Sequence, residues 1–404
     1  MRSNYFAKLM KYMKNVYHID RSIQKLTDAR IYPKYKTTHI IFPLLVGFML
    51  RIKSMNELKL MLYENEFKNV FPRKTELPQI DTIRDTLKVI EVNGFKYILV
   101  HTVKKVIQNK VFDSGTIGGY TVAAIDGTKL FGSYKKCCPK CLTTMVKGRK
   151  YYYHYASVMS IIGEGPKLTL GYEMCRPREG QSRDEGELVA SKNLISDVLR
   201  TYKNFIDVVV YDALGCNSTW INQNISLGID AIVRVKKNNN NSIKQVKKEV
   251  NKQEPSEIWT DEKGFDNVKV YEKTFKMDNV DQPLRFIKFV MKHHDKTRSQ
   301  IMIVTTNMDM SLKTLFKMIR ARWNIENCTF NNLKTECNLN HCYVHGGEAV
   351  EAIIYLIFIA NNIMQLFLTR RLKGRYKTQR EMVRLLLKGL YLLKYNTELV
   401  FNTS

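Results

Sequence analysis

The hydrophobic pattern between residues 120 and 212 constrains the fold more than any other part of the sequence. Residues 120–126, 151–162 and 167–174 are rich in β-branched and aromatic side chains, which is typical of strands. Apolar residues then recur at helical spacing, at Leu188, Leu194, Ile195, Val198 and Leu199. Residues 206–211 form a continuous apolar run, which indicates a buried strand. Three strands, a helix and a fourth strand predict an α/β core.

Two aspartates lie at the ends of these predicted strands. Asp126 closes the first strand, and Asp212 directly follows the fourth. Each aspartate could have an ordinary structural role as well as a functional one. Asp126 precedes a glycine, and Asp-Gly is a strong turn signal. Asp212 precedes Ala213 and Leu214, so it could equally be the N-cap of a helix.

A third carboxylate belongs to a helix-like run over residues 311–334. Leu312, Leu315 and Trp323 share one apolar stripe, which predicts that Trp323 lies in the core. Arg322 and Glu326 are four residues apart and therefore share a face of this helix. Such pairs are usually solvated surface pairs worth a few tenths of a kcal/mol. The aspartates upstream favour a second interpretation, in which Glu326 joins them in one site.

Three carboxylates from distant parts of a chain suit a site that binds two divalent metal ions. Mg²⁺ and Mn²⁺ prefer carboxylate oxygens. Two such ions, about 3.5–4 Å apart, can activate the attacking oxygen and stabilise the leaving oxygen in a displacement at phosphorus. We therefore expect Asp126 to bridge both ions, Asp212 to bind one and Glu326 to bind the other.

Three motifs around these carboxylates resemble those of a known family. AIDGT at residues 124–128, VVYDAL at 209–214 and RWNIEN at 322–327 are similar to motifs of bacterial insertion-sequence transposases of the DDE type. The group with a Tyr-x2-Arg-x3-Glu-x6-Lys signature is the most similar, over about residues 28–372. Arg322 and Glu326 match that signature. Ile319 replaces its Tyr, and Leu333 replaces its Lys, with Lys334 one position later.

The resemblance implies a fold and an activity. The fold is a ribonuclease H-like core interrupted by a β-rich insertion. The activity is metal-dependent cleavage of DNA at terminal inverted repeats and strand transfer into target DNA, by a homodimer or larger synaptic complex. Arg322 and Lys334 are candidate DNA contacts, and Lys129, three residues past Asp126, is a further phosphate-binding candidate. Trp259 could stack a flipped base, although packing is the commoner role of such a residue.

The pattern divides the chain into five segments. We expect a helical DNA-binding or dimerisation domain at residues 1–115 and the first part of the catalytic core at 116–235. A β-rich insertion domain is predicted at 236–300, the second part of the core at 301–372, and a basic helical tail at 373–404.

The charge of the chain favours a polyanionic partner. There are 65 Lys and Arg against 38 Asp and Glu, a net charge of +27 over 404 residues. Double-stranded DNA is the commonest partner of such a protein. The most apolar run, residues 349–360, contains Glu351, so no segment is expected to span a membrane. A cytoplasmic, nucleoid-associated prokaryotic protein is expected.

Cysteine and histidine residues form two clusters near the catalytic motifs. Eight cysteines are too few for a disulfide scaffold of this length. Cys138 and Cys141 form a C-x2-C pair, and Cys342 and His345 follow the third motif. These four residues are the predicted ligands of one structural Zn²⁺, and reduced thiols without metal are the alternative.

Two other functions fit the same sequence. A nuclease of this fold would hydrolyse DNA without joining it. A decayed or domesticated copy would bind specific DNA sequences without cutting them. The intact carboxylate trio argues against decay, whereas the departures at Ile319 and Leu333 leave it open.

Overall fold

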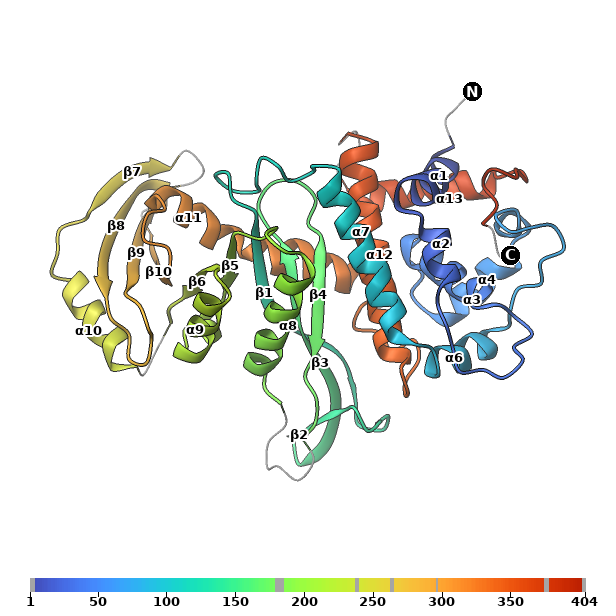
Figure 1. The fold of residues 1–404 in the computed structure, drawn as a ribbon, viewed down its shortest axis with the longest axis horizontal. Coiled ribbons are helices and arrows are strands. Elements are labelled where there is room, and N and C mark those ends of the chain that lie inside the picture. Colours follow the sequence, from blue (N-terminus) through green and yellow to red (C-terminus); the bar gives the residue numbers. More distant parts are fainter. Residues whose placement is uncertain are drawn as a thin grey trace.

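Helices occupy one end of the molecule, and one long sheet runs through the rest (Figure 1). The computed structural model describes residues 4–178, 185–236, 240–261, 265–295, 297–373 and 378–401. The N-terminal part is helical, as the sequence predicts. Its helices are α1 (Tyr5–Tyr17), α2 (Ile19–Gln24), α3 (Thr37–Met49), α4 (Met55–Tyr63), α5 (Asn65–Lys68), α6 (Ile80–Lys88) and α7 (Val92–Gln108).

The last helices of the chain complete this helical part. The long helix α12 (Ala349–Leu366) packs against α3 and α7, and it continues into η4 (Phe367–Arg371). The stretch Ala349–Arg371 is long and apolar enough to cross a membrane, but 89% of its most apolar window is buried inside the protein. This degree of burial is typical of a core helix.

The C-terminal segment is packed rather than free. Helix α13 (Gln379–Tyr391) lies against α1 and buries Met382, Leu386 and Leu390. The predicted tail at 373–404 is thus helical over α13, but this helix belongs to the helical core. Residues 374–377 and 402–404 of that segment lie outside the described residues.

Ten described strands form one mixed sheet in the order β2-β3-β1-β5-β6-β10-β9-β8-β7, with β4 paired to β3. Strands β1 and β5 are parallel, as are β5 and β6, whereas β3 runs antiparallel to β1. The strands are β1 (Val122–Ser133), β2 (Leu142–Val146), β3 (Arg149–Ile161), β4 (Thr169–Met174), β5 (Val208–Tyr211), β6 (Asp230–Arg234), β7 (Glu257–Asp261), β8 (Phe265–Phe275), β9 (Leu284–His293) and β10 (Arg298–Thr305).

The predicted insertion extends the core sheet instead of forming a sheet of its own. Strand β10 pairs with β6 on one side and with β9 on the other, so Ile303 lies opposite both Arg234 and Ile287. Strands β9, β8 and β7 follow outward from β10, and α10 (Asn241–Val250) packs against β8. The sequence between β6 and β10 therefore adds strands to the edge of the core.

Helices cover both faces of the central strands. Helix α8 (Glu187–Thr201) contacts β1, β3 and β4, and α9 (Ser218–Ser226) contacts β6. The chain from α11 (Leu312–Ala321) through η2 (Ile325–Phe330) and η3 (Asn332–Glu336) crosses behind the sheet in Figure 1, and η2 contacts β1. Strand β1 is thus enclosed between α8 and η2.

Candidate active site

Asp126 lies in the middle of β1, opposite Val158 of β3. Its side chain is 17% exposed, and its Oδ1 accepts a hydrogen bond from the backbone N–H of Gly127 at 3.0 Å. The strand continues to Ser133, beyond the end that the sequence predicts. The Asp126-Gly127 pair is therefore part of a strand, and the turn interpretation is wrong.

Asp212 follows β5 and is the N-cap of the short helix η1 (Ala213–Gly215). Its Oδ1 accepts a hydrogen bond from the backbone N–H of Leu214 at 2.7 Å. The parallel pairing of β1 with β5, in which Ala124 lies opposite Val210, brings the chain at Asp212 beside the chain at Asp126. The capping role is thus present, and the second carboxylate oxygen is not used by this cap.

Arg322 connects the third carboxylate to the first. Its Nη2 donates to Glu326 Oε1 at 2.7 Å, and its Nη1 lies 3.6 Å from Asp126 Oδ2. Only 3% of Arg322 is exposed, whereas the Glu326 side chain is 37% exposed. The pair is therefore buried on the arginine side, unlike the solvated pair that helical spacing alone would suggest.

The electrostatics of Asp126 reflect a concentration of negative charge. Burial raises its pKa to about 7, and the neighbouring charges of Glu326, Glu187 and Asp212 act in the same direction. The Arg322 guanidinium opposes this shift. One buried cation among four carboxylates leaves a net negative site, and oxygen donors of this kind suit Mg²⁺ or Mn²⁺.

Glu187 is a member of this group that sequence reasoning missed. It begins α8, and its carboxylate accepts hydrogen bonds from the hydroxyls of Tyr155 at 2.7 Å and Tyr211 at 2.9 Å. A Cβ at position 127 would overlap both the Glu187 carboxylate and the Tyr155 hydroxyl, so Gly127 makes room for them. A glutamate in the first turn of a helix is common, so its sequence position carried no signal.

The helix that carries Glu326 changes its winding before that residue. Helix α11 ends at Ala321, and η2 and η3 are π-helical. The prediction that Trp323 lies in the core is wrong, because its side chain is 40% exposed and packs beneath Arg234 and Arg322. The α-helical stripe used for that prediction loses its phase where the wider turns begin.

The same change of winding affects the last position of the signature. Leu333 is fully buried, whereas Lys334 is half-buried with its Nζ over the Phe330 ring. Burial lowers the pKa of Lys334, and the Asp126 carboxylate opposes that shift. A π-helical turn takes up one more residue than an α-helical turn. Lys334, one position late in the signature, is therefore the lysine on which the charge of Asp126 acts.

The other two predicted DNA contacts, Lys129 and Trp259, lie against aromatic side chains. Lys129 is three residues past Asp126 on a regular strand, so its side chain leaves from the opposite face and packs over Tyr151 and Tyr153. Trp259 is half-buried, with Phe289 and Phe316 edge-on to its ring. These contacts indicate packing for Trp259, and its role in base stacking stays a prediction.

The thiol and imidazole side chains gather at a second place. Cys138, Cys141, His154 and His345 place their ligand atoms within 4.8 Å of one another. The sequence predicts Cys342 as the fourth ligand, whereas the structure places His154 in the group. Strand β3 runs back alongside the Cys138–Cys141 segment, which brings His154 to the two sulfurs, whereas Cys342 is not part of the group.

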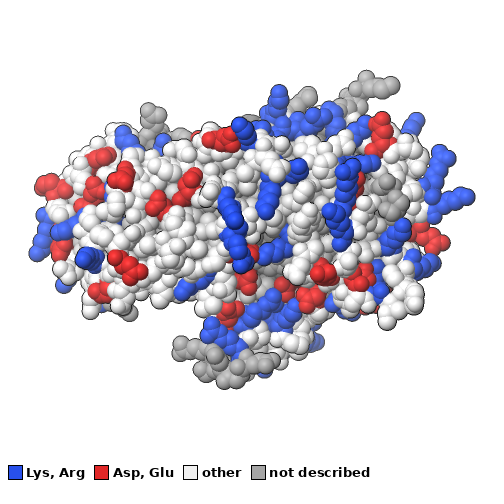
Figure 2. Space-filling view, viewed as in Figure 1, with Lys and Arg blue, Asp and Glu red and all other residues white. Residues whose placement is uncertain are grey.

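Basic side chains spread over the middle and right of the face in Figure 2. They cover the region of β4, α7 and the N-terminal helices, and acidic side chains lie among them. This distribution agrees with the net charge of +27. A cationic surface of this kind attracts the phosphate backbone of nucleic acids.

Comparison with known proteins gives a family match and a similar solved structure. One solved structure, a cryo-EM structure of a piggyBac transposase synaptic complex with hairpin DNA, is 14% identical, with a TM-score of 0.49 over 96% of this chain and 80% of that chain. No curated protein sequence matches the chain. Residues 186–363 match the family described as a transposase DDE domain, and the match includes Asp212 and Glu326. Residues 186–363, somewhat less than half of the chain, are therefore similar to a transposase DDE domain.

Proposed function

We propose that the chain is a DDE transposase, which cuts DNA at the inverted repeats of its own transposon and transfers the freed ends into target DNA. The observation that supports this proposal best is the proximity of the Glu326 and Asp212 carboxylates to Asp126. Arg322 pairs with Asp126 and Glu326, and the charge of Asp212 reaches Asp126. The strand order β4-β3-β1-β5-β6, followed by a helix that carries Glu326, supports a ribonuclease H-like core.

Asp126, Asp212 and Glu326 would hold two Mg²⁺ or Mn²⁺ ions in this proposal. When bound, such ions lower the pKa of an attacking water or hydroxyl and offset charge on the leaving oxygen. The residues present fit this role, because the carboxylates around Asp126 outnumber the nearby cations. Neutralising this excess charge would favour the ionised form of Asp126.

The side chains around the carboxylates position the site. Arg322 holds Glu326 toward Asp126, so it keeps carboxylates from two distant segments at one place. Lys334 adds a positive charge on the same side, where it could contact a DNA phosphate. The Tyr155 and Tyr211 hydroxyls hold the Glu187 carboxylate in place by hydrogen bonds.

The partner in this proposal is double-stranded DNA, both at the transposon ends and at the target. The net charge of +27 supports it. Cleavage of two ends in one event requires two active sites, so the working form would be a homodimer or a larger synaptic complex in the prokaryotic nucleoid. The helical part would contribute DNA binding or dimerisation.

Incubation with DNA tests the proposal directly. The substrate is a duplex carrying the inverted repeats that flank the coding region, and Mn²⁺ is added. We expect 3′-hydroxyl nicks at the repeat ends and joined products with a target plasmid, both lost in Asp126→Asn. The exposed change Lys269→Gln is the matched control and should keep both products.

The two alternative functions give different results in the same experiment. A hydrolytic nuclease would nick the ends without producing joined DNA. A decayed DNA-binding protein would bind the repeats equally well with and without Asp126→Asn, and no product would appear in either case.

A further inference from the structure

A group of four side chains outside the carboxylate site has the composition of a zinc centre. Cys138 and Cys141 lie in the loop between β1 and β2, His154 lies on β3, and His345 lies between η3 and α12. Two thiols and two imidazoles form one of the common ligand sets of structural Zn²⁺. The members come from three separate segments, so local sequence alone does not account for their meeting.

The spacing of the ligand atoms fits a tetrahedron around one ion. Zn–S bonds of about 2.3 Å and Zn–N bonds of about 2.0–2.1 Å at tetrahedral angles place two sulfurs about 3.8 Å apart and a sulfur and a nitrogen about 3.5 Å apart. The two sulfurs are 3.6 Å apart. His154 Nε2 is 3.6 Å from Cys138 Sγ and 3.4 Å from Cys141 Sγ, and His345 Nε2 is 3.6 Å from Cys141 Sγ.

Neither a disulfide nor a set of metal-free thiols accounts for this cluster as well as a metal ion does. A disulfide needs its sulfurs about 2.05 Å apart, well below the distance between Cys138 and Cys141. Hydrogen bonds to sulfur are weak, yet His154 is only 1% exposed and its Nδ1 has no hydrogen-bond partner. Burying an imidazole whose Nε2 has only these weak contacts is unfavourable, and coordination of Nε2 to a metal would replace them with a strong bond.

The surroundings of the cluster also suit a structural metal. The Phe131 ring packs against both imidazoles, with centroid distances of 5.1 Å to His154 and 5.3 Å to His345. The backbone N–H of Cys138 donates to Cys141 Sγ at 3.4 Å, a contact that favours the thiolate. Four protein ligands leave no open position for a substrate, which is the arrangement of structural rather than catalytic zinc.

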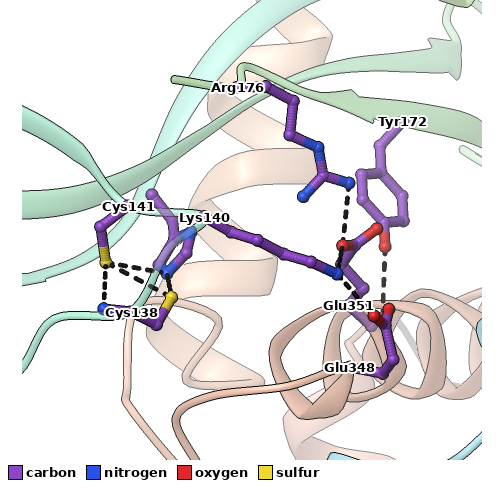
Figure 3. Close-up of polar contacts among 8 residues, drawn as sticks. Cys138, Lys140, Cys141, Tyr172, Arg176, Glu348 and Glu351 are labelled. Atoms are coloured by element: carbon purple, nitrogen blue, oxygen red, sulfur yellow. Dashed lines mark hydrogen bonds and ion pairs between the residues drawn. The ribbon is translucent and has the colours of Figure 1, made fainter. Parts of the chain in front are cut away.

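We infer that Cys138, Cys141, His154 and His345 bind one structural Zn²⁺ that fastens the β1–β3 hairpin to the segment preceding α12. Lys140, between the two cysteines, reaches Glu348 at 2.7 Å and Glu351 at 3.1 Å near the start of that helix (Figure 3). Arg176 also pairs with Glu351, at 2.8 Å. The metal and these ion pairs therefore join the same two parts of the chain.

This junction has a consequence for the carboxylate site. Strand β1 carries Asp126, and the chain from η2 through η3 carries Glu326 and leads to His345. The zinc centre closes a loop through both segments, so it would limit their relative movement. The zinc inference does not depend on DNA cleavage, because its test measures metal content and spectra rather than activity.

The first test uses the intact wild-type chain. Protein produced in medium with zinc and purified without chelators should contain about one Zn²⁺ per chain by mass spectrometry of the metal. Replacement by Co²⁺ should give the intense visible absorption and thiolate charge-transfer bands of a tetrahedral cobalt site. A protein without zinc whose cobalt form shows a weak octahedral spectrum, or a Cys138–Cys141 disulfide, would overturn the inference.

The second test separates His154 from the neighbouring Cys342. Zinc content should fall to near zero in His154→Ala and stay at the wild-type level in Cys342→Ser. The opposite pattern would assign the metal to Cys342 and overturn the ligand set. The cobalt spectrum of the wild-type protein decides between zinc and bare thiols whether or not His154→Ala folds.

Discussion

At the scale of single residues, Asp126 is the group whose protonation most affects the site. Its pKa is raised from 3.8 to about 7, mainly by burial, so the folded chain binds this proton more tightly than the unfolded chain does. The stability that follows from this shift is fully present below about pH 4. It is lost as the pH rises through about 7.

The resulting prediction concerns the metal-free protein. Between pH 4 and pH 7 the free energy of unfolding of the wild type should fall by a few kcal/mol relative to Asp126→Asn, at about 1.4 kcal/mol per pKa unit. Urea unfolding of both proteins in EDTA measures this difference. Mn²⁺ should reverse the trend near neutral pH, because it binds the ionised carboxylates. Parallel pH profiles of the two proteins would show that Asp126 has an ordinary pKa.

Residue-level prediction from sequence succeeded where a pattern had a direct geometric consequence. Strands and a helix near Asp126, Asp212 and Glu326 could be predicted from hydrophobic period. In the structure Arg322 pairs with Asp126 and Glu326, and the charge of Asp212 reaches Asp126. His154 could not be found this way, because its approach to Cys138 depends on the pairing of β2 with β3. Glu187 could not be identified from the sequence for a similar reason, since its partners Tyr155 and Tyr211 come from two separate strands.

At the scale of elements, the contact between β1 and α8 requires a glycine at position 127. A Cβ at position 127 would overlap the Glu187 carboxylate and the Tyr155 hydroxyl. Gly127→Ala should therefore lower the free energy of unfolding by about 1–3 kcal/mol, as overpacking does. Gly186→Ala is the matched control, because its Cβ would meet nothing within 4 Å, and it should cost less than about 1 kcal/mol. Equal effects in chemical denaturation would contradict the proposed crowding.

A second element contact joins α12 to β4 through one amide. Asn362 is fully buried, its Oδ1 accepts from the Thr169 backbone N–H at 2.9 Å, and its Nδ2 donates to the Thr169 carbonyl at 2.8 Å. Asn362→Leu leaves both backbone groups without these partners, so we expect a loss of about 2–4 kcal/mol in unfolding free energy. Thermal or urea unfolding checks this value. A change below about 0.5 kcal/mol would mean that water or another group replaces the amide.

The features that sequence analysis did not predict share a cause, which is that strand pairing and helix winding are not local properties. The strand pattern of residues 236–300 was visible, but only the pairing of β10 with both β6 and β9 shows that these strands extend the core sheet. The helix at 311–334 was likewise visible, but its π-helical turns were not. An α-helical pattern therefore predicted Trp323 in the core, whereas its side chain is exposed in the structure.

At the scale of the whole molecule, the excess of positive charge governs association with DNA. Six to ten phosphate contacts would reduce affinity by about 10³–10⁵-fold between roughly 50 and 200 mM salt. Fluorescence anisotropy with transposon-end DNA measures this dependence, with a random duplex as control for the sequence-independent part. An affinity that changes by less than about threefold over that range would show that the basic surface does not contact the phosphate backbone.

The central claim is that Asp126, Asp212 and Glu326 form one site for divalent ions. Iron-directed cleavage of the polypeptide tests it without DNA, because Fe²⁺ bound in place of Mg²⁺ produces hydroxyl radicals that cut the nearby chain. We predict cuts close to residues 126, 212 and 326, which excess Mg²⁺ suppresses and Asp126→Asn abolishes together. Zn²⁺, rather than Mg²⁺, should suppress any cuts around residues 138–154. Cuts that omit one of the three carboxylate segments, or that persist unchanged in excess Mg²⁺, would contradict the shared site.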